Sequence, residues 1–322
     1  MKPPYDITSE ILHLITAISE KIGEVNAIHL HKPSPELRKK NRVKTIRASL
    51  EIEGNTLTEE QITAIIENKR VIGPKKDILE VVNAIKVYEL LPEFKPNSLT
   101  SFLKAHQTLM KDLIPSAGKL RTKAVGIVKG EEIAHIAPPA SNVNFLMKDL
   151  FAYLKNDKDP ALIKSCVFHY ETLFIHPFMD GNGRMSRLWQ TLILLNTYPV
   201  FEFLPFETII KDRQEQYYNA LSLCDKVGKS TIFIEFILQA IDESLAELLQ
   251  LQQPKMNGKA RVAYFISMYK SDSFTRKDYL LAFKDISSAT ASRDLKYAVA
   301  ANFITKEGDK RVTKYSINPK EK

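Results

Sequence analysis

The chain has 322 residues, of which 44% are hydrophobic and 26% charged, an ordinary globular balance with enough apolar surface for two domains. No window approaches the roughly 18 apolar residues of a membrane span, and residues 1–20 lack the unbroken apolar run of a signal peptide. We therefore expect a cytoplasmic protein that does not enter the membrane. The two cysteines, Cys166 and Cys224, are far apart in sequence, and we expect Cys166 to be a buried free thiol.

The net charge of +8 is unevenly distributed along the chain. Residues 257–322 hold 14 Lys/Arg and 7 Asp/Glu, whereas residues 1–256 hold 32 and 31. The basic excess therefore belongs to the C-terminal segment, and the overall charge says little about the rest of the chain.

Helical periodicity dominates the first third of the chain. Isoleucines at positions 11, 15, 18 and 22 predict an amphipathic helix. A second helix is expected to begin near Pro35 and to end at Gly54. Thr58 and Gln61 form a capping box that opens a third helix. Further helices are expected after Asp77 and over residues 98–114.

Ser49 and Glu53 lie four residues apart at the end of the second helix, and hence on one face. The helix dipole disfavours a glutamate in the last turn. Two interpretations are open for Glu53. It is either solvated, or paired with an arginine from elsewhere in the fold.

The pattern changes between residues 121 and 139. Apolar residues on either side of a turn at Gly130 predict a short β-hairpin, which on these residues alone is a surface ribbon. Helices then resume over residues 141–154, from an Asp159–Pro160 start to Phe174, over residues 212–223 and over residues 231–252. Tyr217 and Tyr218 lie in the third of these.

The densest group of polar residues follows the helix that ends near Phe174. Within twelve residues it contains an imidazole, a carboxylate, two glycines around an amide, and two arginines: His176-Pro177-Phe178-Met179-Asp180-Gly181-Asn182-Gly183-Arg184-Met185-Ser186-Arg187. The glycines allow positive φ angles that turn backbone N–H groups toward an anion, and the apolar spacing after them predicts a helix start, itself an anion site.

Each side chain of this stretch suits a site for a polyphosphate and a metal. Arg184 and Arg187 fall in the first turn of the helix, where only an anion between them would offset the unfavourable dipole. Asp180 can hold Mg²⁺ against a phosphate. His176 precedes a proline, which disfavours helix, so its ring can act as a base at the mouth of the loop. The alternative for each residue alone is structural.

Beyond a linker at residues 252–258, three helices and a β-hairpin with a Glu307-Gly308-Asp309 turn are expected. This order resembles a winged helix, a fold that often places its third helix in the DNA major groove. The basic excess agrees with DNA binding. Asp294 and Asp309 are expected on the reading surfaces and argue against it, so dimerisation or docking of a target is the alternative.

The twelve-residue stretch matches the Fic family motif, HPFx[D/E]GNGRxxR, at every fixed position, and the segment from Ser49 to Gly54 matches the inhibitory motif [S/T]xxxE[G/N] of many Fic proteins. The chain thus resembles a Fic protein with its inhibitory helix placed before the core. The implied fold is mainly α: an N-terminal helical region over residues 1–95, a Fic helical bundle with a β-hairpin flap over residues 96–253, and a winged-helix-like domain over residues 254–322.

The resemblance implies transfer of AMP from ATP to a Ser, Thr or Tyr hydroxyl of a protein, with release of pyrophosphate. His176 would be the base, and Asp180 would hold Mg²⁺. The remaining positions implied to contact ATP include the Tyr pair near the adenine, with Asn182 also on the α-phosphate, Arg184 on the β-phosphate and Arg187 on the γ-phosphate. The positions implied to contact ATP are therefore Gly181, Asn182, Gly183, Arg184, Arg187, Tyr217 and Tyr218. For the two tyrosines, core packing is the alternative.

Two further features follow from the resemblance. The hairpin would be the flap that pairs with the backbone of the target, at Val125, Gly126, Ile127 and Val128. Glu53, with Ser49 on the same face, would pair with Arg187, compete with the γ-phosphate and keep the enzyme off.

Several alternatives stay open from the sequence. A related enzyme could transfer UMP, phosphate or phosphocholine, although Gly183 argues against the kinase-like relatives. A DNA-binding regulator could use the Fic core only to sense nucleotide, although His176 argues against pure sensing. The target protein, self-modification, removal of AMP from a target and a homodimer are not decided by the sequence.

Overall fold

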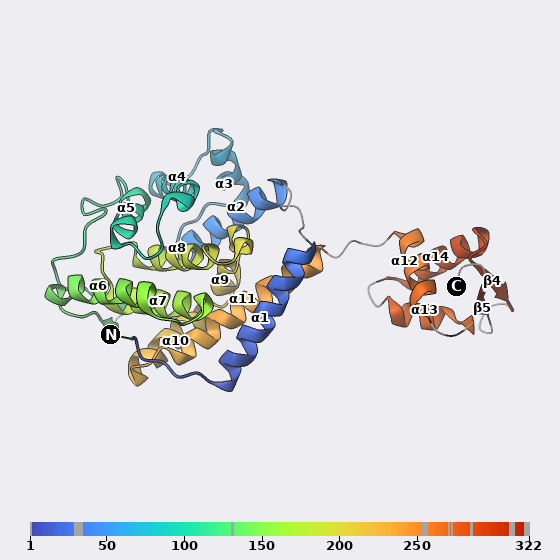
Figure 1. The fold of residues 1–322 in the computed structure, drawn as a ribbon. Helices are drawn as coiled ribbons and strands as arrows, with labels where there is room; N and C mark the ends of the chain where they lie inside the picture. Colours follow the sequence, from blue (N-terminus) through green and yellow to red (C-terminus); the bar gives the residue numbers. More distant parts are fainter. Residues whose placement is uncertain are drawn as a thin grey trace. The chain divides into compact units, whose positions relative to one another are not determined.

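The computed structural model of the chain describes residues 2–28, 35–129, 132–252, 257–269, 271, 273–283, 286–308 and 313–318. These residues form two compact units, Met1–Leu251 and Gln252–Lys322 (Figure 1). The described part is mainly helical, as the sequence predicts. None of its helices is long and apolar enough to cross a membrane.

Helices build most of the first unit. They are α1 Ser9–Ile28, α2 Pro35–Glu51, α3 Glu59–Ile66, α4 Lys75–Glu89, α5 Leu99–Leu109, α6 Ala140–Asn156, α7 Ala161–Ile175, α8 Asn182–Leu195, α9 Glu207–Asp212, α10 Gln214–Val227 and α11 Thr231–Gln252. Two short 3-10 helices, η1 Leu91–Glu93 and η2 Pro199–Glu202, and a hairpin of β1 Gly126–Lys129 and β2 Glu132–Ile136 accompany them.

The pair α7 and α8 occupies the centre of this unit (Figure 1). Both helices bury side chains on almost every face. Helices buried on all sides must be covered by neighbours, which here include α2, α5 and α6. The loop that joins α7 to α8 is the predicted motif stretch, so the core itself fixes both of its ends.

An aromatic cluster lies directly beneath the motif loop. Phe102 of α5 packs against Phe168, Phe178 and Trp189, with ring centroids 5.0–5.7 Å apart. Phe178 is fully buried, as expected for an anchor of the loop. The motif therefore rests on a cluster of buried aromatic rings in the core.

Most predicted elements are present, with three shifts in their bounds. The capping box of Thr58 and Gln61 and the flap hairpin are confirmed. The helix predicted over 98–114 ends earlier, at Leu109, and the one predicted over 212–223 is α10, which begins at Gln214 and continues to Val227. Gly130, the turn residue of the hairpin, lies outside the described residues.

The third shift concerns Asp159, which the Asp–Pro pair predicts as a helix cap. Pro160 takes that place in the structure. The Asp159 carboxylate instead accepts hydrogen bonds from Lys2 at 2.7 Å, Tyr5 at 2.5 Å and Tyr153 at 2.8 Å. A long-range contact thus replaces a local one, and it ties the first residues of the chain to the start of α7.

The second unit has its own apolar core and a small sheet. It contains α12 Gly258–Met268, β3 Ser273–Phe274, α13 Arg276–Ala282, α14 Ser288–Ala300, β4 Ile304–Glu307 and β5 Lys314–Ile317. The strands are ordered β3-β5-β4 and are antiparallel. The two-residue β3 is too short to be predicted from alternation. Part of the predicted linker, residues 253–256, lies outside the described residues.

The prediction that Asp294 faces the reading surface is wrong. Asp294 is 5% exposed, and its carboxylate accepts hydrogen bonds from Arg261 at 2.7 and 3.0 Å. Tyr279 also donates to it, at 3.3 Å. The helical pattern could not reveal this partner, which comes from α12. Asp309 lies outside the described residues.

Replacing Phe102 by Ala should lower the free energy of unfolding by about 3–5 kcal/mol, because the cavity would remove contacts from the buried rings of Phe151, Phe168, Phe178 and Trp189. Urea denaturation would measure this loss. Phe145→Ala is the matched control, since Phe145 is 68% exposed on α6 and should cost little. Equal losses in the two variants would contradict the assigned core.

Candidate active site

Two residues with left-handed backbone conformations define the ends of the motif loop. His176 caps the C-terminus of α7 in the left-handed region, at φ 50° and ψ 60°, and is half-buried. Gly181 opens α8, also in the left-handed region at φ 84°. These turns bring the imidazole and the free N–H groups at the start of α8 to the two ends of one short loop.

Arg121 binds this loop through backbone carbonyl oxygens, and no sequence pattern predicts this role. Its side chain is almost fully buried and donates to the carbonyl oxygens of His176 at 2.7 Å and Ile175 at 3.2 Å. It also donates to Lys123 at 3.0 Å and Pro138 at 2.5 Å, which flank the hairpin. A cation at a helix C-terminus satisfies carbonyls that the helix leaves free. Arg121 thus connects the base of the flap to His176.

Asn182 fixes the shape of the loop rather than facing a ligand. Its side-chain oxygen accepts from the backbone N–H of Phe178 at 2.9 Å, and its amide nitrogen donates to the carbonyl of Phe178 at 3.0 Å. The side chain is buried. Both polar atoms of this side chain are thus bonded within the loop. Its backbone N–H at the start of α8 stays suited to an anion.

The two glycines serve different purposes. Gly181 needs its positive φ, as expected. Gly183 has ordinary helical geometry, which corrects the expected positive φ there. A Cβ on Gly183 would lie 2.3 Å from Glu53 Oε1, so glycine is required for close approach of that carboxylate.

Arg187 is the most deeply buried charge of the site. It is 1% exposed, and its Nη2 donates to Glu53 Oε1 at 2.7 Å and to the carbonyl of Ser49 at 2.8 Å, while Nε donates to Ser49 Oγ at 3.1 Å. Burial disfavours the charge of the guanidinium, but the nearby carboxylate of Glu53 outweighs this and raises the pKa of Arg187. The sequence-predicted ion pair is therefore present, and it joins α8 to the end of α2.

Arg184 is held in place by an acid that the sequence analysis missed. Its Nη1 donates to Glu80 Oε1 at 3.0 Å, and its Nη2 donates to Asp180 Oδ1 at 3.2 Å. Glu80 is buried on α4 and accepts a further bond from Asn55 at 2.9 Å. Glu80 and Arg184 are 104 residues apart, so no local sequence pattern predicts that they pair. The pair becomes visible only where the fold brings α4 and α8 together.

Asp180 is the candidate metal ligand, and its surroundings fit a hard cation. Half of its side chain is exposed at the loop, and its bonds from Gly181 N–H and Arg184 both go to Oδ1. Among the described residues, no three His, Cys, Asp or Glu side chains form a ligand group. Asp180 therefore fits Mg²⁺ only in the common arrangement of one carboxylate together with substrate phosphates.

The two tyrosines separate into a core residue and a surface residue. Tyr217 is 1% exposed and hydrogen-bonds through its hydroxyl to His169 Nε2 at 2.9 Å, so core packing is the correct interpretation and an adenine contact is not. Burial lowers the pKa of His169 to about 3, which keeps this network neutral. Tyr218 is 38% exposed, with its ring 5.3 Å from that of Tyr217. Only Tyr218 is placed to meet a ligand.

The flap hairpin pairs in antiparallel register from Gly126 with Ile136 to Lys129 with Glu132. The register shifts between Ile127 and Val128, where the strand bulges. Val125 is half-buried just before the first strand. The side chains of residues 126–136 lie outside those described, so the expected backbone pairing with a target rests on the strands alone.

Glu207 is a fully buried carboxylate of α9 next to the Arg187 helix. Thr191, one turn beyond Arg187, donates to Glu207 Oε1 at 3.0 Å. Burial, opposed mainly by hydrogen bonds and Arg187, raises the pKa of Glu207 to about 7. The native chain therefore binds this proton more tightly than the unfolded chain does, and stability falls as pH rises from about 4.5 to about 7.

Replacing Glu207 by Gln should change stability little near pH 4 and raise it by as much as about 3 kcal/mol near pH 8. Urea denaturation across this pH range would measure the difference. Glu93→Gln, on an exposed glutamate, is the control. A gain for Glu207→Gln that is the same at both ends of the range would contradict the assigned burial.

Comparisons with known proteins identify the family of the chain. The family model described as Fic/DOC family matches residues 96–194. The solved structure of a Fic family protein from Desulfovibrio desulfuricans is 39% identical, covers 99% of both chains and superimposes with a TM-score of 0.76. The chain belongs to the Fic family.

More distant relatives match about three quarters of the chain. The structure of Fic-1, residues 134–508, from C. elegans is 20% identical, covers 76% of this chain and 74% of that one, and gives a TM-score of 0.64. The Protein adenylyltransferase Fic of Drosophila grimshawi is 27% identical over 241 residues, or 72% of this chain and 48% of its own length. That of Drosophila melanogaster is 27% identical over 242 residues. The chain thus spans about half the length of these curated relatives.

Proposed function

We propose that the chain transfers AMP from ATP to a hydroxyl side chain of a protein. The observation that carries the proposal is the single short loop that joins His176, Asp180 and the start of α8, in a chain of the Fic family. Relatives named protein adenylyltransferase support the same reaction. A cytoplasmic location and ATP as the substrate belong to this proposal.

The reaction forms one bond and breaks one bond at the α-phosphorus. His176 takes the proton of the target hydroxyl, whose oxygen attacks the α-phosphorus, and the bond to the β-phosphate oxygen breaks to release pyrophosphate. The backbone N–H groups of Asn182 and Gly183 bind the phosphates, and the turn at Gly181 presents them. When bound, Mg²⁺ on Asp180 supplies charge neutralisation between the phosphates.

The two arginines and the flap position the reactants. Arg184, oriented by Glu80, binds the β-phosphate, and Arg187 binds the γ-phosphate once it is released from Glu53. Tyr218 contacts the adenine. The flap, anchored through Arg121, holds the backbone of the target so that its hydroxyl reaches His176.

The inhibitory role of Glu53 is part of this proposal. Its carboxylate occupies the guanidinium that the γ-phosphate needs, and Gly183 leaves the space for it to do so. ATP bound to this form adopts an unproductive pose. The chain is therefore organised as an N-terminal region, residues 1–95, that controls a catalytic core, residues 96–253.

Replacing Glu53 by Gly should raise AMP transfer by roughly tenfold or more, because a charge-assisted bond to Arg187 becomes available to ATP. Replacing His176 by Ala should lower it roughly 10²–10⁴-fold. Incorporation of α-labelled ATP into the protein itself and into lysate proteins would measure both.

Glu51→Gly is the matched control, since Glu51 lies at the same helix end but pairs with Lys211 at the surface. Equal labelling of the wild type and Glu53→Gly would contradict inhibition. Labelling by UTP in preference to ATP would favour transfer of UMP. Mass spectrometry of the labelled products would identify the target and would test self-modification. Loss of label from the purified product over time would test removal of AMP, and light scattering would test a homodimer.

The second unit carries a second candidate function, binding of DNA. Its order of helices and strands is that of a winged helix, with α14 as the third helix. Because Asp294 is buried against Arg261, the exposed face of α14 presents Ser292, Arg293 and Lys296 without an acid. Arg276 and Lys277 of α13 are also exposed. This surface suits a phosphate backbone better than the sequence alone suggests.

Replacing Arg293 and Lys296 together by Ala should weaken binding of the full chain to a labelled DNA duplex and reduce the salt slope by about 2. Fluorescence anisotropy over a series of salt concentrations would measure both quantities. The control variant replaces Lys104 and Lys148, two exposed lysines of the first unit, by Ala. Equal effects of the two variants, or no binding by the wild type, would contradict this function and favour dimerisation or target docking.

A further inference from the structure

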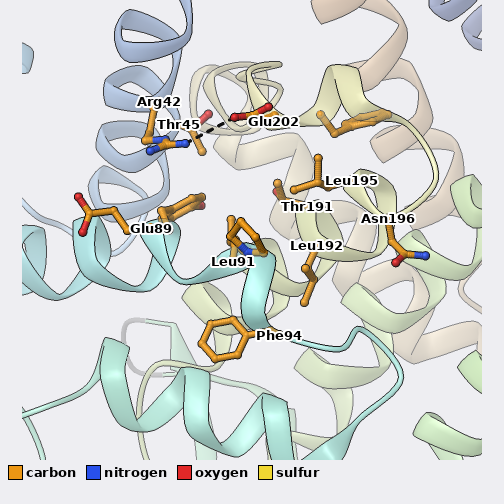
Figure 2. A pocket seen from close by; sticks show the side chains of 13 residues that line it. Arg42, Thr45, Glu89, Leu91, Phe94, Thr191, Leu192, Leu195, Asn196 and Glu202 are labelled. Carbon is orange, nitrogen blue, oxygen red and sulfur yellow. Dashed lines mark ion pairs between the residues drawn. The ribbon is translucent and has the colours of Figure 1, made fainter. Parts of the chain in front are cut away.

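A cavity of about 340 Å³ lies between α2, α4 and α8, and none of its lining residues belongs to the motif loop (Figure 2). Figure 2 shows Arg42 directed toward Glu202, 3.9 Å away. Glu89 adds a second carboxylate to the lining. One cation with two acids selects no class of ligand, so no function is assigned to this cavity.

His106 of α5 is a fully buried imidazole in contact with the motif loop. Its ring stacks on that of Phe178, with centroids 3.5 Å apart and an angle of 3° between the planes. Both of its nitrogens are bonded. Nδ1 lies 2.8 Å from the backbone nitrogen of Gly118, and Nε2 lies 3.0 Å from the carbonyl oxygen of Asp180. Stacking and two hydrogen bonds thus fix both the place and the rotation of this ring.

The bond from Gly118 decides which nitrogen of His106 carries the proton. A backbone N–H can only donate, so Nδ1 accepts and is not protonated. The neutral ring then carries its proton on Nε2 and donates it to the carbonyl oxygen of Asp180. Glycine permits this approach of residue 118, because its φ is 79° and a Cβ there would lie 2.8 Å from Cβ of Gln107.

The bond to Asp180 orients the peptide group that joins Asp180 to Gly181. In a planar trans peptide the C=O and the N–H point in opposite directions. Since His106 holds the carbonyl toward α5, the N–H of Gly181 points away from α5, where it donates to Asp180 Oδ1 at 2.6 Å. Gly181 also lies close to α5, because a Cβ there would be 2.7 Å from Met110 Sδ. Helix α5 therefore sets the direction of this N–H.

The Gly181 N–H in turn holds the carboxylate of Asp180. Oδ1 accepts this bond and a second from Arg184 Nη2 at 3.2 Å, which leaves Oδ2 for a cation. Half of the Asp180 side chain is exposed, so these two bonds hold its rotamer more than burial does. If the peptide turned, Oδ1 would lose one of its two donors. His106 thus acts on the carboxylate through a single peptide group.

We propose that His106 is a positioning residue of the nucleotide site, which holds the carbonyl of Asp180 so that the Asp180 carboxylate stays turned toward Mg²⁺. His106 itself contacts neither the metal nor the nucleotide. The proposal rests on Asp180 as the metal ligand of the proposed function, and not on transfer of AMP to a protein. Residues that orient a metal ligand typically contribute roughly 10–100-fold to metal affinity.

Two variants separate the bond to Asp180 from the other contacts of His106. Both remove the ring and its stacking on Phe178. The amide of glutamine reaches the position of Nε2, so His106→Gln keeps a donor for the Asp180 carbonyl. The amide of asparagine reaches only the position of Nδ1, so His106→Asn keeps the acceptor for Gly118 and loses that donor. His106→Gln is therefore the matched control for His106→Asn.

Calorimetric titration with ADP, with and without Mg²⁺, measures how much the metal strengthens nucleotide binding. ADP is the suitable probe because it lacks the γ-phosphate, and Glu53 occupies Arg187. Mg²⁺ should strengthen ADP binding to the wild type and to His106→Gln by roughly tenfold or more, and His106→Asn should lose most of this gain. Binding of ADP without Mg²⁺ should differ little between the two variants. A purely structural role would instead lower both affinities together.

An equal gain from Mg²⁺ in His106→Asn and His106→Gln would overturn the proposal, as would the absence of a gain in the wild type. If neither variant folds, nitrogen-15 NMR of the wild type decides. His106, identified by its contact with Phe178, should be protonated at Nε2, and this N–H resonance should move when Mg²⁺ is added to the ADP complex. Protonation at Nδ1, or an unmoved resonance, would overturn the proposal. Failure of the wild type and of Glu53→Gly to label any protein would contradict AMP transfer alone, since ADP binding is measured separately.

Discussion

Burial of the Arg187 guanidinium is the constraint on which the rest of the site depends. A cation that is 1% exposed needs anionic or carbonyl partners, because leaving it unpaired in the core would cost several kcal/mol. Here Glu53 and Ser49 of α2 provide them. The same helix contact therefore contributes to folding and occupies the group that the γ-phosphate requires in the proposed reaction, so activation has to replace one anion with another.

The other residues of the site fix the motif loop and Arg184 around the place where this exchange of anions occurs. Asn182 closes the motif loop on itself, Arg121 fixes the end of α7 together with both sides of the flap, and Glu80 orients Arg184. A side chain at Gly183 would collide with the inhibitory carboxylate. The side chain of Glu53 is 30% exposed, so it can leave Arg187 toward solvent when a phosphate takes its place.

Sequence patterns predict the local features well and the long-range partners poorly. The motif loop, the helix that carries Glu53 and the flap hairpin follow from spacing, glycine and capping signals, which act within a few residues. Arg121 and Glu80 could not be found this way, since their partners are distant in sequence. The predicted exposure of Asp294 is wrong for the same reason, and the sequence could not decide between core packing and a ligand contact for Tyr217. A helical pattern predicts which face of a helix is buried, but not which polar group of another element lies against that face.

The most direct test of this account compares the affinities of ATP and ADP for the wild type and for Glu53→Gly, by calorimetry with magnesium present. If Glu53 occupies Arg187, the γ-phosphate adds little to binding in the wild type, and ATP and ADP bind almost equally. In Glu53→Gly the bond to Arg187 becomes available, and ATP should bind roughly tenfold or more tightly than ADP. The same ratio of ATP to ADP affinity in both proteins would contradict the account.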